Sequence, residues 1–299
     1  MKNRAIIIVC MFSIFFCAGQ RIAEHIKNPK LRKITVGATR SFMLEPTISE
    51  GSGLIGVNGT LLTHNDSGSS SLFVIDSASG KRIGEYALPI SNYDWEDMSQ
   101  DKSFIYLGAF GNNYGKRDTL QIYRIDKSSL ATNKISIDSI SFTWPAIRRK
   151  GRKKFNFDCE AMAIVNDSIF LFTKEWKGGR KSRVFAIPNK PGHHRAEYRF
   201  TLNTNLLITG ASYNESRKQL VLCGYSVLLK PYLLVFPFVA GTDFFRKGGT
   251  KIKIKRKYRQ AEGVTTFDGI TYYVVNERFK FWIFKSRPYI SVYKITADK

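Results

Sequence analysis

Short apolar runs alternate with turn residues along most of this chain, and this pattern predicts an all-β protein. The clearest unit runs from Glu262 to Asn276, where an acidic start leads into strand, turn and strand. Similar units begin at Ser52, Glu96, Glu160 and Thr209. Each opens with a small or acidic residue. The chain therefore contains an internal repeat.

The repeated units predict blades of a propeller. The first four units cover residues 52–89, 96–145, 160–202 and 209–258, and each of them accommodates four strands. The fifth unit begins at Glu262 and shows one strand fewer. Four-stranded units arranged radially are typical of β-propellers. We predict an all-β, five-bladed β-propeller whose ring is closed by an N-terminal strand, residues 34–39, that completes the last blade.

The first residues resemble an export signal. Lys2 and Arg4 precede an apolar run from Ala5 to Phe16, and the small residues that follow, through Gly19, fit a cleavage site. We predict a signal peptide at 1–19, a leader at 20–33 and a single propeller domain at 34–299. The mature protein is expected to be secreted or periplasmic, with a lipid anchor at Cys17 as the alternative. No later segment has the length and apolarity of a transmembrane span.

The net charge narrows the class of partner. The chain carries 47 Lys and Arg against 24 Asp and Glu, a formal charge of +23. Basic residues cluster at 148–154, 174–183 and 251–259, and such a surface attracts polyanions. No nucleic-acid-binding motif is present, so no sequence-specific nucleic-acid partner is expected. The expected partner is an anionic ligand, either a phosphate-bearing small molecule or a polyanionic glycan.

The residues that open the units indicate a metal site. In a propeller the innermost strands begin near the central channel, so their first side chains approach one another. Three carboxylates on one axis need protonation, a basic partner or a cation. Carboxylates with hydroxyls and no His or Cys suit Ca²⁺, which we predict on the axis. Alternatively, the glutamates bond backbone amides of neighbouring blades. The five predicted metal ligands are Ser52, Glu96, Glu160, Thr209 and Glu262.

The loops after the second strands are expected at the same mouth of the channel. They supply two candidate catalytic bases, His64 and Asp66. The candidate ligand-binding residues are Asn65, Asn112, Asn113, Lys174, Trp176, Tyr225, Asn276 and Arg278. The alternative is that the Asn and Asp residues simply form turns.

The unit starts also resemble a known family. Their order of hydroxyl, Glu, Glu, hydroxyl and Glu, with residues 50–55, Asn58-Gly59, Asp66-Ser67-Gly68 and 262–264, is similar to calcium-activated nucleotidases of the apyrase type. That resemblance implies a secreted five-bladed enzyme that hydrolyses nucleoside diphosphates with a central calcium. The family's Asp-rich segment before the first blade is missing. Residues 63–68, 94–97 and 111–113 also resemble uncharacterised exported bacterial propeller proteins, which implies no activity.

Three functions remain open from the sequence. The first is a calcium-centred propeller that binds an anionic, phosphate-bearing ligand at the channel mouth. The second is a calcium-dependent phosphohydrolase of the apyrase or phytase kind, and the third is a structural scaffold for partner proteins. The sequence contains no phosphate-binding glycine loop, nucleophile elbow or zinc pattern, which excludes several common enzyme classes.

Overall fold

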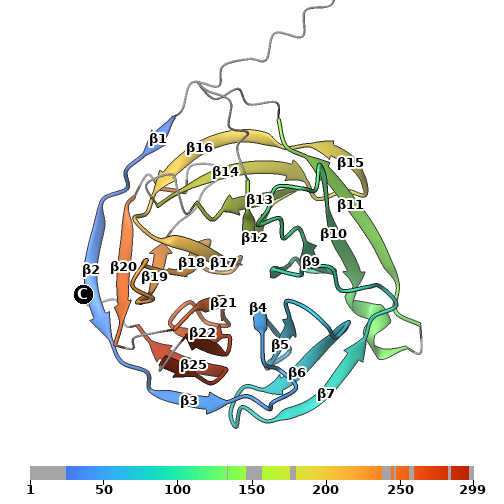
Figure 1. The fold of residues 1–299 in the computed structure, drawn as a ribbon, viewed down its shortest axis with the longest axis horizontal. Helices are drawn as coiled ribbons and strands as arrows, with labels where there is room; N and C mark the ends of the chain where they lie inside the picture. The colour runs from blue at the N-terminus through green and yellow to red at the C-terminus, as the bar shows by residue number, and fades with distance from the viewer. Residues whose placement is uncertain are drawn as a thin grey trace, which may run out of the picture.

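Five sheets surround a central channel in the computed structural model (Figure 1). The described residues are 25–132, 134–145, 157–175, 180–237, 244–245, 247–255, 259–281 and 284–295. Over these residues the chain is an all-β, five-bladed β-propeller, which confirms the predicted fold. The signal peptide predicted at 1–19 lies outside the described residues.

Each blade is built from four antiparallel strands ordered from the channel outwards. The innermost strands are β4 (Gly51–Val57), β8 (Asp97–Gln100), β12 (Cys159–Val165), β17 (Leu207–Asn214) and β21 (Ala261–Thr266). The second strands are β5 (Thr60–Asn65), β9 (Phe104–Ala109), β13 (Ser168–Thr173), β18 (Gln219–Tyr225) and β22 (Thr271–Asn276).

The third and fourth strands form the outer half of each blade. The third strands are β6 (Ser71–Asp76), β10 (Thr119–Asp126), β14 (Lys181–Pro188), β19 (Pro231–Phe236) and β25 (Tyr289–Lys294). The fourth strands are β7 (Arg82–Ala87), β11 (Ile137–Thr143), β16 (Glu197–Asn203), β20 (Gly249–Ile254) and β3 (Arg40–Met43). A short 3-10 helix, η1 (Lys127–Ala131), joins β10 to β11.

Three blades gain a fifth strand that pairs in parallel with the outer edge. β15 (Gly192–Arg195) pairs with β11, β1 (Ile26–Lys27) with β16, and β2 (Leu31–Val36) with β20. The N-terminal segment therefore follows the rim of the ring past the third and fourth blades before it enters the fifth (Figure 1). β1 and the first part of β2 lie inside the segment 20–33 that we expected to be a leader.

The strand that closes the ring is not the one expected. An N-terminal strand does complete the last blade, but it is β3, which pairs antiparallel with β25. The predicted segment 34–39 instead contributes Ile34 and Val36 to β2 on the fourth blade. Ile34 and Val36 pack against the hydrophobic cluster between the fourth and fifth blades. Their burial there places this strand on the fourth blade instead of the fifth. The sequence pattern marked a strand without showing which sheet edge it would cover.

The hydrophobic core is divided among the interfaces between blades. Five clusters of buried residues occur, one between each pair of neighbouring sheets, and the fifth blade packs against the first through Val275 and Leu54. Cys159 and Cys223 are free, buried thiols. Within the described residues, no helix is long and apolar enough to cross a membrane. The hairpin β23 (Phe279–Phe281) and β24 (Phe284–Ser286) is inserted before β25.

Candidate functional site

The strand register brings the unit starts and the predicted loops to one mouth of the channel. Because the first two strands of each blade are antiparallel, the start of the first faces the end of the second. Gly51 is thus paired with Asn65, and Ala261 with Asn276. The starts of the innermost strands and the ends of the second strands therefore lie at one end of the ring, which we call the acidic mouth.

Three buried glutamates surround one lysine at the acidic mouth. Lys174 Nζ donates to Glu160 Oε2 at 3.0 Å. Although burial lowers it, the charges of Glu160, Tyr225, Glu262 and Glu96 raise the pKa of Lys174 well above its usual value. Burial, together with the charge of Glu160, raises the pKa of Glu96 well above its ordinary range. Burial likewise raises the pKa of Glu262. A basic partner and protonation therefore both relieve the crowded carboxylates.

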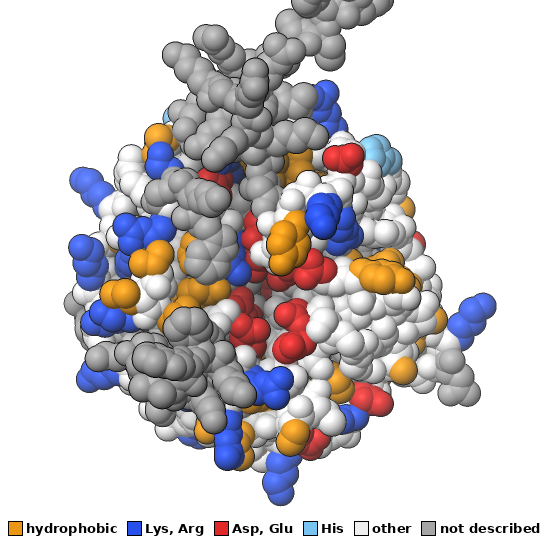
Figure 2. Space-filling view, in the orientation of Figure 1, with side chains coloured by type: hydrophobic (Ala, Val, Ile, Leu, Met, Phe, Trp, Pro, Cys, Tyr) orange, Lys and Arg blue, Asp and Glu red, His pale blue; other side chains and the backbone are white. Residues whose placement is uncertain are grey.

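Further carboxyls lie beside these glutamates. Asp158 is 3% exposed, and its Oδ1 atom has no hydrogen-bond partner among the described residues. Burial and the neighbouring Glu160 raise the pKa of Asp158 to about 8. Asp94 and Glu96 both approach Gly111 so closely that a Cβ there would collide with them. Figure 2 shows Asp and Glu side chains gathered around the hollow centre of this face.

A second cluster of carboxyls at the acidic mouth is centred on Asp66. Burial and a hydrogen bond to Glu50 raise the pKa of Asp66 to about 8, and the bond to Asp66 lowers the pKa of Glu50. Such opposite shifts are expected when two carboxyls share a proton. Burial raises the pKa of the adjacent Glu277 to about 7. Asp66 Oδ1 has no hydrogen-bond partner in the described part of the chain.

The two predicted hydroxyl ligands connect blades. Ser52 Oγ donates to the backbone carbonyl of Glu96 in the next blade at 2.5 Å. Thr209 Oγ1 donates to the carbonyl of Ala261, again across a blade interface. Both side chains are buried. Their hydroxyls therefore form hydrogen bonds that connect neighbouring blades.

The register also shows which residues occupy equivalent positions. In four blades a β-bulge interrupts the innermost strand, and the bulged residue is Gly53, Glu160, Thr209 or Glu262. In the second blade β8 pairs with β9 without a register shift. In the first blade Ser52 lies one residue before the bulge position, which Glu160 and Glu262 occupy in their blades.

Asp97 occupies the middle of the channel. It is fully buried, and its Oδ2 accepts the backbone N–H groups of Met162 at 2.9 Å and Ala211 at 3.1 Å. Its Oδ1 accepts the N–H of Met98. One side chain thereby links the second, third and fourth blades. Burial raises the pKa of Asp97 well above its usual value, although the three N–H donors oppose that shift.

His64 is placed below the mouth and is completely buried. Its Nδ1 lies 2.9 Å from the Asn65 carbonyl, and its ring meets Trp95 edge to face with 5.7 Å between centroids. Burial lowers the pKa of His64 to about 4. Nε2 has no partner among the described residues. A neutral ring sealed from solvent is poorly placed to take a proton from a ligand in the channel.

The amide candidates hold loops in place. Asn65 bonds the backbone of Glu50 and Thr47, and Asn112 makes two bonds with the backbone of Arg117. Asn276 donates to the carbonyls of Glu277 and Arg287. These contacts agree with the turn interpretation of these residues.

The remaining candidates differ in their exposure. Tyr225 is buried, with Lys174 Nζ 5.8 Å from its ring centroid. Asn113 and Arg278 are exposed, and the charge of Arg278 helps to lower the pKa of Glu50. Trp176 lies outside the described residues. In the part of the chain that the structure describes, no group of three or more His, Cys, Asp or Glu is arranged to hold a metal ion.

The carboxyls that sequence analysis did not select had a detectable signal. Asp94 and Asp158 each precede a predicted glutamate by two residues. That spacing could have added both to the cluster. Asp97 gave no such signal, because its partners come from distant blades.

Comparisons with known proteins add no family. No family model matches the chain, and no curated protein does. A chain in the crystal structure of the mitotic checkpoint complex is similar at 11% identity, covering 91% of this chain and 98% of that one with a TM-score of 0.46. Apo AztD from Citrobacter koseri is similar at 10% identity, covering 75% of this chain and 67% of that one with a TM-score of 0.39. The chain is therefore placed by its own fold, as a five-bladed β-propeller.

Proposed function

We propose that the protein is an exported binding propeller whose acidic mouth takes up Ca²⁺ and, once loaded, holds an anionic, phosphate-bearing ligand. The observation that carries the proposal is the excess of buried carboxyls over cations around Lys174. Glu96, Asp158, Glu160 and Glu262 are all buried there. One ammonium group does not neutralise them, so a divalent cation is the natural complement.

The donor types suit a hard cation, although the described side chains are not arranged around one in the present conformation. The donor set consists of carboxylate oxygens, and Asp158 supplies one without a hydrogen-bond partner among the described residues. The Lys174 ammonium is hydrogen bonded to the Glu160 carboxylate. Metal binding at Glu160 therefore requires Lys174 to release it. The residues that would hold the ion are Glu96, Asp158, Glu160 and Glu262. Ser52 and Thr209 contribute by fixing the blades rather than by ligation.

The metal is also what makes an anionic ligand compatible with this mouth. Carboxylates alone repel phosphate, whereas a bound divalent ion reverses the local charge and leaves coordination positions for phosphate oxygens. Arg278 and Arg117 lie at the same mouth and offer further positive charge. The ligand is therefore expected to bind only when calcium is present.

The test is a melting experiment with the full chain in calcium, magnesium and chelator. A ligand that binds only the folded state raises Tm, so calcium should raise it and chelator should reverse the rise. Glu96→Gln and Glu262→Gln should abolish the rise. Glu197→Gln is the matched control, since Glu197 is exposed and, among the described residues, pairs with Arg199 alone on the surface. Equal calcium-induced shifts in all four proteins would overturn the proposal.

Calcium-dependent phosphohydrolysis is the second candidate, and the Asp66–Glu50 pair favours it. A carboxyl with a pKa of about 8 exchanges protons near neutral pH, as a general acid or base must. Phosphate release from nucleoside diphosphates and phytate, measured with calcium and with chelator, separates hydrolysis from binding. Activity that disappears in Asp66→Asn would support the enzyme. Saturable binding of the same compounds without release would support the binding protein. If the compounds are neither hydrolysed nor bound, the scaffold function remains.

A further inference from the structure

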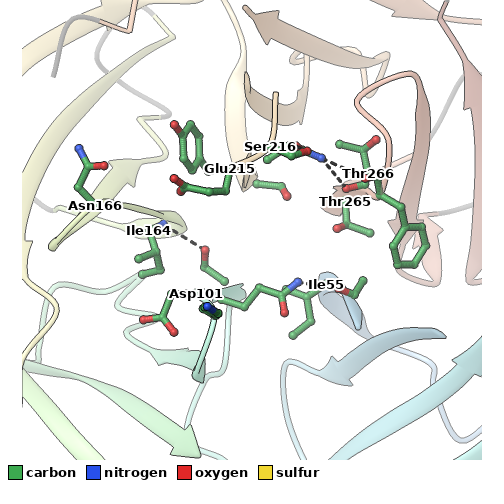
Figure 3. Close-up of a pocket in the computed structure, with 16 residues that line it drawn as sticks. Ile55, Asp101, Ile164, Asn166, Glu215, Ser216, Thr265 and Thr266 are labelled. Carbon is green, nitrogen blue, oxygen red and sulfur yellow. Dashed lines mark hydrogen bonds between the residues drawn. The ribbon is translucent and has the colours of Figure 1, made fainter. Parts of the chain in front are cut away.

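A second cavity opens at the other end of the channel. Its volume is about 630 Å³, within the range of small-molecule sites. It is lined by the distal halves of the innermost strands and by the turns that follow them (Figure 3). Asp97 precedes the lining residues Ser99 and Gln100 on β8 and separates this cavity from the acidic mouth. We call it the distal cavity.

The distal cavity offers hydrogen-bonding groups that the fold does not use. The hydroxyls of Ser212 and Thr265 have no partner among the described residues, nor does the side-chain amide of Asn166. Glu215 accepts no hydrogen bond on its carboxylate within the same residues. Ser99 Oγ accepts the Ile164 N–H at 3.2 Å and keeps its own proton to donate. Glu215 and Thr265 lie on either side of the open centre in Figure 3.

Other polar groups of the lining are committed to the scaffold. Gln100 donates to the Gly56 carbonyl and accepts from Lys127. Asp101 accepts from Ser103, Phe104 and the Tyr106 hydroxyl. Asn166 and Glu215 are exposed turn residues, so Ser212 on β17 and Thr265 on β21 are the free groups that the sheets hold in place.

An aromatic ring forms one wall of the cavity. Phe267 is 38% exposed, and its ring lies over Gly56 of the first blade, where any Cβ would collide with it. Asn214 of the fourth blade donates to the Phe267 carbonyl at 3.3 Å, and Tyr273 packs against the ring at 5.6 Å between centroids. Three blades therefore position an exposed ring beside the unused hydroxyls.

The charge of the distal cavity differs from that of the acidic mouth. Its charged lining residues are Asp101, Lys102 and Glu215. The lining thus carries one lysine against two carboxylates, of which Asp101 is hydrogen bonded by Ser103, Phe104 and Tyr106. Recognition there must depend on hydrogen bonds and on apolar contact with the ring rather than on net charge.

We propose that the distal cavity binds a short neutral oligosaccharide. Sugars present paired donor and acceptor hydroxyls for Ser212, Thr265 and Glu215, and their C–H faces suit an aromatic wall such as Phe267. The cavity volume admits more than one sugar ring. The site is independent of calcium and of the acidic mouth, because Asp97 and its bound amides lie between them.

The experiment is calorimetric titration of the full chain with maltotriose, cellotriose and N,N′-diacetylchitobiose, all in chelator. At least one should bind saturably at millimolar concentration. Phe267→Ala should weaken that binding about tenfold, since an aromatic contact contributes roughly 1 kcal/mol beyond its area. Thr265→Val, which keeps the shape and removes the hydroxyl, should weaken it about fivefold. Tyr114→Ala is the aromatic control, because Tyr114 is exposed and does not line the cavity.

The outcomes separate this proposal from the calcium site. Binding in chelator that falls in Phe267→Ala and Thr265→Val but not in Tyr114→Ala supports the distal cavity, whatever calcium does. No saturable binding of any of the three sugars overturns it. Equal binding in the parent and in both cavity variants also overturns it, because the sugar would then occupy another surface. A circular dichroism spectrum of each variant shows that the fold is retained.

Discussion

The Asp97 carboxylate accepts the backbone N–H of Ala211 at 3.1 Å, although 114 residues separate the two along the chain. The same oxygen accepts the N–H of Met162, so one buried side chain links three blades. Asp97→Ala would leave three buried N–H groups without their acceptor. We expect it to lower the free energy of unfolding by about 3 kcal/mol or more. Urea denaturation measures this loss.

Asp97→Asn is the matched variant for this test. Its side-chain oxygen can still accept N–H groups, so its loss should be clearly smaller than that of Asp97→Ala. Equal losses in the two variants would show that volume, rather than hydrogen bonding to the neighbouring blades, determines the effect.

Lys174→Met tests the balance of charge at the acidic mouth. It leaves the buried Glu160 carboxylate without its partner, and breaking a buried pair in this way costs about 3 kcal/mol or more. In calcium the variant should regain stability and bind the metal more tightly than the parent, because the competing ammonium is gone. Chemical denaturation with and without calcium measures both effects. A variant that calcium does not stabilise would contradict the proposed site.

The raised pKa of Asp158 predicts a pH dependence of stability in chelator. Its carboxyl has a folded-state pKa of about 8 against an ordinary 3.8. The unfolded chain therefore releases this proton first as pH rises, and stability declines from about pH 4 to pH 8. Asp158→Asn should flatten the decline, and calcium should oppose it in the parent. A parent curve identical to that of Asp158→Asn would refute the assignment.

His64 predicts the opposite slope on the acidic side. Its pKa is about 4 in the fold and 6.5 when exposed, so the unfolded state binds the proton first as pH falls. Stability should decrease from about pH 6.5 to pH 4 by as much as roughly 3 kcal/mol. The difference between the parent and His64→Gln over this range isolates the effect, because the other groups titrate in both proteins. A constant difference would show that His64 does not titrate as described.

Ser52→Ala tests whether the Ser52 hydroxyl connects two blades by a hydrogen bond or binds the metal. Loss of the hydrogen bond to the Glu96 carbonyl should cost about 1 kcal/mol of stability. The calcium-induced rise in Tm should nevertheless remain. If Ser52→Ala removes that rise while Glu197→Gln does not, the hydroxyl is a ligand and its observed bond is secondary.

The sequence by itself determined the class of fold and the order of its blades. Apolar runs of strand length, the Asn58-Gly59 turn and the repeated unit starts are local signals that depend on near neighbours. They predicted five blades and brought Glu96, Glu160 and Glu262 to one mouth. Asp94 and Asp158, two residues before Glu96 and Glu160, could also have been added from the sequence.

Only the tertiary structure decided what those signals left open. Residues 34–39 had the pattern of a strand, but burial against the fourth blade, not the pattern, selected its sheet edge. Lys174 beside Glu160, the burial of His64 and the three-blade contacts of Asp97 join residues that are distant in sequence. The distal cavity depends on such contacts too. A local pattern specifies a strand and its faces, whereas the partners of a side chain follow from how the sheets pack.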